Sequence, residues 1–206
     1  GTTIFTEMSA MAQAHGALNM SQGFPDFQPP QPLQQAVVAA MAEGRNQYAP
    51  MTGDARLREW IAEDAEQRSG VRYHPETEVT VGAGASSLIF ATVQALIHPG
   101  DDVMVLTPCY DLYEPAVELA GGRLVCVPLQ AETHRLDLPA MKAAWTESMR
   151  MVIVNVPNNP TGSAWSREDL RGLADLVEGT DALVVSDEVY GPMHHDGREV
   201  LSVTYE

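Results

Sequence analysis

Polar side chains with useful chemistry follow two apolar segments of this chain. Residues 182–186 are apolar except for a final serine, and they are followed by the carboxylate of Asp187 and the phenol of Tyr190. Residues 151–155 lead into a turn rich in proline and asparagine that contains Asn159. A carboxylate can hold a positive charge, and an amide and a phenol can orient a polar ring through hydrogen bonds. The alternative is that Asp187 caps an ordinary turn.

The two apolar segments predict strands that are buried on both faces. Uninterrupted runs rich in β-branched residues are typical of a parallel sheet covered by helices. We expect five such strands, at residues 79–81, 103–106, 123–128, 151–155 and 182–187. Because such sheets place their chemistry where the strands end, Asn159, Asp187 and Tyr190 should share one edge of the sheet.

Small residues form a turn after the first of these strands. Residues 82–87 read Gly-Ala-Gly-Ala-Ser-Ser, and a helix is predicted over residues 88–97. The free N–H groups and the dipole of a helix N-terminus bind phosphate, so Gly84, Ala85 and Ser86 are candidates for a phosphate site. A tight connection with Ser86 as the N-cap residue is the alternative. Nucleotide binding is disfavoured, because no lysine follows and the glycine spacing is not that of a dinucleotide fingerprint.

The composition favours a folded core and argues against several kinds of partner. The sequence has 206 residues, of which 45% are hydrophobic, and this is ample for a core. The formal net charge of −16 argues against nucleic-acid and anionic-membrane partners, because both are negatively charged. We find no signal peptide and no apolar run long enough to cross a bilayer. Two cysteines are too few for a disulfide framework, so we expect a cytoplasmic protein.

Two other features invite a chemical interpretation that the sequence does not support. Cys109 has no histidine or other base paired with it by a motif, so we do not expect a nucleophile there. His194 and His195 are adjacent, and adjacent side chains point apart. No carboxylate or cysteine accompanies them at a ligand spacing, so we expect surface residues and no metal site.

Five strings of the sequence carry a resemblance to a known family. P-N-N-P-T-G at 157–162 and V-V-S-D-E-V-Y at 184–190 resemble the cofactor core of class I/II pyridoxal-phosphate aminotransferases. The other three are similar to the branch that contains methionine and kynurenine (glutamine-transaminase-K-like) aminotransferases. They are N-M-S-Q-G-F-P-D-F at 19–27, N-Q-Y-A-P-M-T-G at 46–53 and V-G-A-G-A-S-S-L at 81–88.

The resemblance implies an α/β fold with three α/β/α layers, the fold type I of pyridoxal-phosphate-dependent transferases. Its mostly parallel sheet would be incomplete in this chain. Residues 1–45 would contribute to the small domain and the substrate pocket, and residues 46–206 would form a truncated large cofactor-binding domain. The five predicted strands would be the first five of seven, and the first would pair with the seventh. We therefore expect that the 206 residues do not fold stably in isolation.

The resemblance also implies roles for the residues at the strand ends. Asp187 would keep the pyridoxal phosphate ring nitrogen protonated, and Tyr190 and Asn159 would bond the oxygen of the ring hydroxyl. Tyr110, which follows the strand at 103–106, would lie flat on the ring, although a plain core aromatic is the alternative.

Three more residues receive roles from the resemblance alone. Tyr48 would reach across a homodimer to the cofactor phosphate of the neighbouring subunit. The backbone of Gly23 and the side chain of Phe24 would line the substrate pocket, although the strip that contains them also reads as a plain loop.

The implied function is an aminotransferase that moves the amino group of methionine, aromatic or kynurenine-like amino acids to a 2-oxo acid. The alternatives are a carbon–sulfur β-lyase of the same fold and a lysine-less relic that binds the cofactor without catalysis. The family carries its reactive lysine in an S-x-x-K string beyond the last strand predicted here. Lys142, the one lysine of this chain, lies in a helix predicted over 138–147. We expect it to be a surface residue and the chain alone to be inactive.

Overall fold

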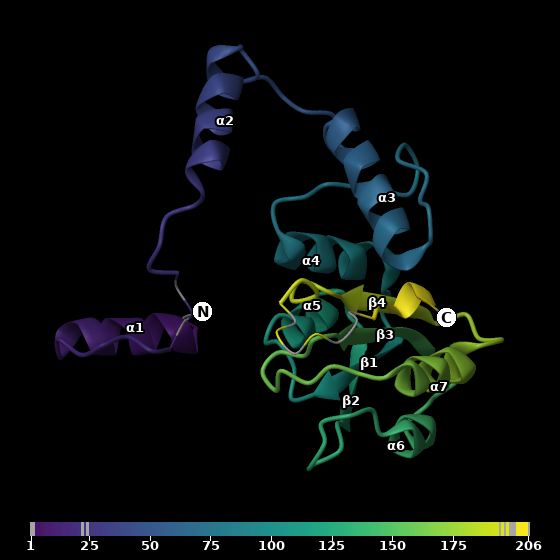
Figure 1. Cartoon of the computed structure of the whole chain (residues 1–206). Coiled ribbons are helices and arrows are strands. Elements are labelled where there is room, and N and C mark those ends of the chain that lie inside the picture. Colours follow the sequence, from purple (N-terminus) through teal and green to yellow (C-terminus); the bar gives the residue numbers. More distant parts are fainter. Residues whose placement is uncertain are drawn as a thin grey trace. The chain divides into compact units, whose positions relative to one another are not determined.

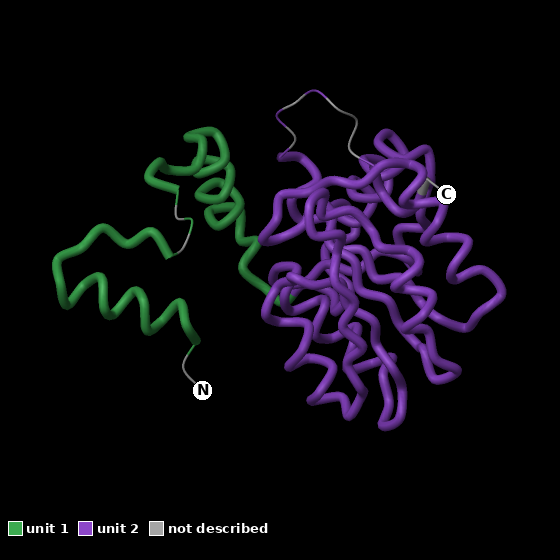
Figure 2. The backbone as a smooth tube through the Cα atoms, turned by 90° about the horizontal axis from the view of Figure 1, so that it is seen from below, with its two compact units in different colours: residues 1–48 green, residues 49–206 purple. Residues whose placement is uncertain are grey.

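The computed structural model describes residues 3–21, 23, 25–193, 195, 197 and 201–205 (Figure 1). The chain divides into two compact units, Gly1–Tyr48 and Ala49–Glu206, which are coloured separately in Figure 2. Each unit is described below by itself. The roles assigned to residues 1–45 and 46–206 in the sequence analysis stay predictions.

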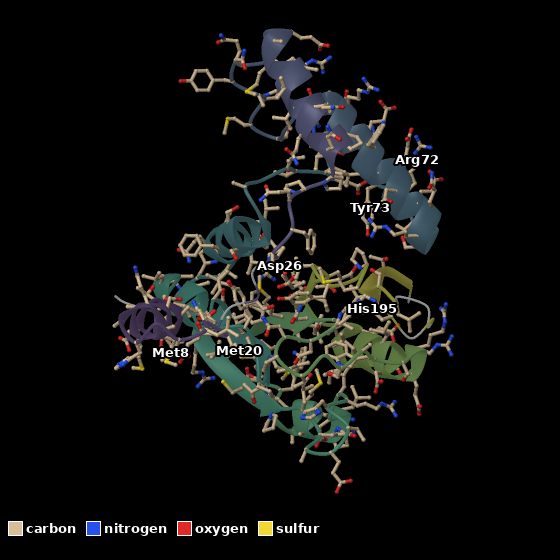
Figure 3. All side chains as sticks on the ribbon, turned by 60° about the vertical axis from the view of Figure 1, so that its left-hand side comes forward. Met8, Met20, Asp26, Arg72, Tyr73 and His195 are labelled. Carbon is tan, nitrogen blue, oxygen red and sulfur yellow. The ribbon has the colours of Figure 1, made fainter. Side chains whose placement is uncertain are left out.

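The first unit consists of two helices, α1 (Ile4–Ala14) and α2 (Gln31–Ala42). The hydroxyl of Thr3 accepts a hydrogen bond from the first turn of α1 and caps it. Neither helix buries a residue in the described structure. Met8 and Met20, which are labelled in Figure 3, line an apolar groove of this unit.

The second unit is built on a four-stranded sheet in which every pair of neighbours is parallel. Its strands are β1 (Asp102–Thr107), β2 (Arg123–Pro128), β3 (Met149–Asn155) and β4 (Leu183–Asp187). Their order in the sheet is β2-β1-β3-β4. These elements confirm the predicted strands at 103–106, 123–128, 151–155 and 182–187.

Helices cover both faces of this sheet (Figure 1). The helices and the final short 3₁₀ turn are α3 (Ala55–Ser69), α4 (Ala85–Leu96), α5 (Tyr113–Leu119), α6 (Leu138–Ala143), α7 (Arg167–Val177) and η1 (Val203–Tyr205). Val103 and Val105 of β1 pack with α4 and α5, whereas Met104 and Leu106 pack with α6 and α7. Successive strand residues therefore feed two opposite cores, which gives three α/β/α layers.

The structure corrects three of the predicted elements. The predicted strand at 79–81 is wrong: none of the four described strands pairs with it, and Val81 N donates instead to Thr52 O at 3.0 Å. A short apolar run without a neighbouring strand cannot form a ladder. The helix predicted over 88–97 begins earlier, with Gly84 and not Ser86 as its N-cap. The helix predicted over 138–147 ends at Ala143.

A buried carboxylate joins three segments at the amino ends of the strands. Asp102 is fully buried, and it accepts two hydrogen bonds from the Arg123 guanidinium and one from the hydroxyl of Thr146. These residues begin β1, begin β2 and precede β3. The hydrogen bonds from Arg123 hold the pKa of Asp102 below its ordinary value against the opposing effect of burial. Among the described residues, no helix is both long and apolar enough to span a membrane.

Candidate active site

A cavity of about 290 Å³ opens at the carboxyl ends of β3 and β4. This volume is near the lower limit of about 300 Å³ for small-molecule sites. The first turn of α4, two tyrosines, two asparagines and one aspartate contribute to its wall. The lining residues are Ala83, Gly84, Ala85, Ser86, Ile89, Tyr110, Asn155, Asn159, Asp187, Val189 and Tyr190. The structure thus brings together seven of the residues that the sequence analysis selected.

The N-terminus of α4 forms one side of the cavity. Gly84 has φ of +91°, a conformation that side-chain-bearing residues rarely adopt, and it begins the helix without a side-chain cap. A Cβ atom built on Gly84 would meet nothing within 4 Å, so the space in front of this turn is open. The hydroxyl of Ser86 lies 3.5 Å from that of Tyr110. An uncapped first turn with a nearby hydroxyl is suited to an anion such as phosphate.

Asp187 forms the opposite polar wall at the end of β4. Only 8% of this residue is exposed. The Tyr113 hydroxyl donates to its Oδ2 at 2.8 Å, and the backbone N–H of Val189 donates to its Oδ1 at 3.3 Å. Burial raises the pKa of Tyr113 above its ordinary value, and the hydrogen bond to Asp187 raises it further. Tyr113 is therefore a neutral donor to an acidic acceptor.

An amide and a phenol stand together beside this carboxylate. Asn159 Nδ2 donates to the hydroxyl of Tyr190 at 3.3 Å. Asn155 is buried at the end of β3 and bridges the two strand exits. Its Nδ2 donates to the backbone oxygen of Asp187 at 2.8 Å, and its Oδ1 accepts from the backbone N–H of Asn159 at 2.6 Å.

Tyr110 provides an aromatic ring at the end of β1. The residue is half-buried and lines the cavity. Its ring packs edge-to-face on that of Tyr113, with centroids 5.9 Å apart and planes at 80°. A planar ligand in the cavity can gain apolar burial and stacking against such a ring.

The sequence analysis assigned no role to Tyr113 or Asn155. Tyr113 lies at the first position of α5, three residues after Tyr110. That spacing on a helical turn is a signal that the two side chains are neighbours. Asn155 was noted only as the end of its strand, although a buried amide at a strand end requires hydrogen-bond partners.

Other predicted site residues lie elsewhere. Tyr48 and Gly23 belong to the first unit, where both are exposed. Phe24 lies outside the described residues, as does His194, while His195, labelled in Figure 3, is exposed. The described ranges contain no group of three or more His, Cys, Asp or Glu side chains that could hold a metal.

Two reactive residue types are placed away from any catalytic partner. Burial is the main cause that raises the pKa of the Cys109 thiol above its ordinary value, which disfavours the thiolate. Lys142 is exposed on α6 and is not among the residues that line the cavity. Both placements agree with the expectation that neither residue supplies the chemistry.

Residues 16–203 match the family described as aminotransferase class I and II. The chain belongs to this family. The methionine aminotransferase of Escherichia coli (strain K12) is 44% identical over 190 residues, which are 92% of this chain and 49% of the relative. The kynurenine–oxoglutarate transaminase of Dictyostelium discoideum is 32% identical over 217 residues, covering 97% of this chain and 50% of the relative. The chain therefore spans about half the length of the curated relatives it matches.

A solved structure of an aminotransferase shares the fold. The N-succinyldiaminopimelate aminotransferase of Mycobacterium tuberculosis superposes with a TM-score of 0.93 at 41% sequence identity. The match covers 98% of this chain and 53% of that protein. The α/β fold seen here is that of the fold type I pyridoxal-phosphate enzymes, and this chain forms about half of it.

Aminotransferases of this family depend on pyridoxal 5'-phosphate, and the groups around the cavity fit that cofactor. The uncapped turn at Gly84 suits the phosphate, and the carboxylate of Asp187 suits a protonated ring nitrogen. Asn159 and Tyr190 are paired donors that suit the ring oxygen, and Tyr110 offers an aromatic surface. The individual roles of these residues stay predictions.

Proposed function

We propose that the protein is a pyridoxal-phosphate-dependent aminotransferase that moves the amino group of methionine, aromatic or kynurenine-like amino acids to a 2-oxo acid. One observation carries the proposal: a single cavity joins the uncapped first turn of α4 to Tyr110, Asn159, Asp187 and Tyr190. The E. coli and D. discoideum relatives named above support the donor class.

Each residue of the cavity has a defined task in this reaction. When bound, the cofactor supplies a ring that accepts electrons while an amino group is taken from one substrate and passed to a second. Asp187 holds a proton on the ring nitrogen and so keeps the ring electron-poor. Asn159 and Tyr190 hold the ring oxygen, and Tyr110 covers the ring and excludes water.

The group that moves the substrate's α-proton is proposed to lie outside these 206 residues. A lysine is required for this step, and Lys142 is exposed on α6 and absent from the cavity wall. We therefore propose that the chain alone is inactive and that activity belongs to the full-length protein.

The proposed partners are small molecules and a second copy of the chain. Amino acids and 2-oxo acids are the substrates, and the net charge of −16 argues against nucleic acid or an anionic membrane. A cytoplasmic location is part of the same proposal, and the two free thiols of Cys109 and Cys126 support it.

Tyr48 is the proposed contribution of the second subunit to each site. Its side chain is fully exposed and so is available to a partner. In the full-length protein, Tyr48→Phe should raise the dissociation constant of pyridoxamine 5'-phosphate about tenfold, as expected for one hydrogen bond to a charged group. Binding of pyridoxamine, which lacks the phosphate, should not change. Equal weakening of both ligands would contradict the proposed phosphate contact.

A panel of amino donors tests the proposed function directly. With full-length protein and pyridoxal phosphate, methionine, phenylalanine and kynurenine should give kcat/KM values at least about tenfold above those of aspartate and N-succinyldiaminopimelate. A pocket built for apolar side chains leaves a second carboxylate unpaired, which is costly. Aspartate or N-succinyldiaminopimelate as the best donor would refute the donor class. Pyruvate release from cystathionine without transamination would favour the β-lyase, and binding without turnover would favour the non-catalytic relic.

A further inference from the structure

The carboxylate of Asp187 is held by a residue from a distant part of the chain. Tyr113 lies 74 residues earlier, yet its hydroxyl donates to Asp187 Oδ2 at 2.8 Å. Tyr113 is only 1% exposed, so water does not compete for this bond. In the described chain, the other hydrogen bond to this carboxylate is the longer one from Val189 N to Oδ1, at 3.3 Å.

We propose that Tyr113 is a positioning residue for Asp187. Its hydroxyl fixes Oδ2, favours the ionised carboxylate and leaves Oδ1 available to the ring nitrogen of the cofactor. This inference rests on the proposed function, because it assigns Tyr113 a task at the same site.

The carboxylate needs such a partner for two physical reasons. The last torsion of an aspartate side chain has a broad energy minimum, so the carboxylate rotates easily unless a partner fixes it. An ionised carboxylate that is 8% exposed also requires hydrogen bonds to replace those of water. A donated hydrogen bond meets both needs, since it orients the group and favours its charged form.

Tyr113 is itself held rigidly enough to impose this geometry. It belongs to a buried cluster that includes Val105 of β1 and Val117 of α5. Its ring also packs edge-to-face on Tyr110, a second residue of the cavity wall. Since burial and the carboxylate raise the pKa of Tyr113, it remains a hydrogen-bond donor at and above neutral pH.

The experiment uses the full-length protein and pyridoxamine 5'-phosphate, a ligand without an aldehyde whose binding requires no covalent bond to lysine. Tyr113→Phe removes the hydroxyl and keeps the ring. The dissociation constant should rise about 10- to 100-fold, the range for one hydrogen bond to a charged group. Tyr73→Phe is the matched control, because Tyr73 is half-buried and lines a different cavity of the second unit (Figure 3). The control should bind as the wild type does.

A double-mutant cycle separates a positioning role from a structural one. Asp187→Asn should weaken binding by itself, and adding Tyr113→Phe to it should change the dissociation constant by less than about twofold. Equal effects of Tyr113→Phe in both backgrounds, or wild-type affinity of Tyr113→Phe, would overturn the inference. Wild-type affinity of Asp187→Asn would instead overturn the proposed function.

A second variant guards against a folding defect. Tyr113→His retains a side-chain N–H donor, and its affinity should lie between those of the wild type and Tyr113→Phe. Thermal melting of the ligand-free proteins accompanies each titration. If both variants fail to fold without ligand, the inference is overturned, because Tyr113 then serves the core and not the carboxylate.

Discussion

Asp187→Ala in the full-length protein should lower kcat/KM for transamination by about 10²–10³-fold, the loss found when one preorganised electrostatic group is removed from an active site. The carboxylate lies at the end of β4 and lines the cavity, where it would hold the proton on the ring nitrogen. Without it the ring accepts electrons less well, so the step that breaks the substrate's C–H bond slows.

The control for this prediction is Asp175→Ala. Asp175 is exposed on α7 and does not line the cavity. Its replacement should leave kcat/KM within about twofold of the wild type and so report any general effect of losing a carboxylate. Turnover by Asp187→Ala at the wild-type rate would remove Asp187 from the mechanism and with it the assignment of this cavity.

Asp102→Ala should lower the free energy of unfolding by about 2–3 kcal/mol, the value of a strong hydrogen bond to a charged group. The carboxylate is fully buried and joins β1 to Arg123 and Thr146. The loss should be smaller than for a wholly buried ion pair, because the Arg123 side chain stays largely exposed. Urea unfolding at neutral pH measures the difference.

The same contact predicts how stability depends on pH. Because the hydrogen bonds from Arg123 lower the pKa of Asp102 in the folded state, its contribution is fully present above the unfolded pKa of about 4. The contribution is lost as the pH falls through the lower folded value. The stability gap between wild type and Asp102→Ala should therefore narrow in acid. Glu66→Ala, which removes an exposed partner of Arg72, should cost less than about 0.5 kcal/mol, and a pH-independent gap for Asp102→Ala would contradict the account.

The strands and their exits were readable from the sequence because local pattern determines them. Uninterrupted apolar runs stop sharply at Thr107, Asn155 and Asp187, and a parallel sheet brings those ends to one edge. The run at 79–81 has the same local pattern but no neighbouring strand among the four described, and pairing is a property of two segments. Local pattern alone therefore predicted a strand where the structure has none.

Part of the candidate site could not be read from the sequence for the same reason. Tyr113 reads as the apolar start of a short helix, and its contact with Asp187 exists only once α5 packs beside β4. The bridging bonds of Asn155 likewise connect two exits that are 32 residues apart. Contacts of this length arise from the packing of the whole unit.

Asn155 also determines how the cavity responds when charge moves within it. One side chain bonds both the end of β4 and the turn that carries Asn159, so these two exits cannot shift independently. The dipoles around the cavity are therefore aligned by folding, before any ligand arrives. A field that is set in advance needs little reorientation as a reaction proceeds, whereas water would have to turn its molecules at each step.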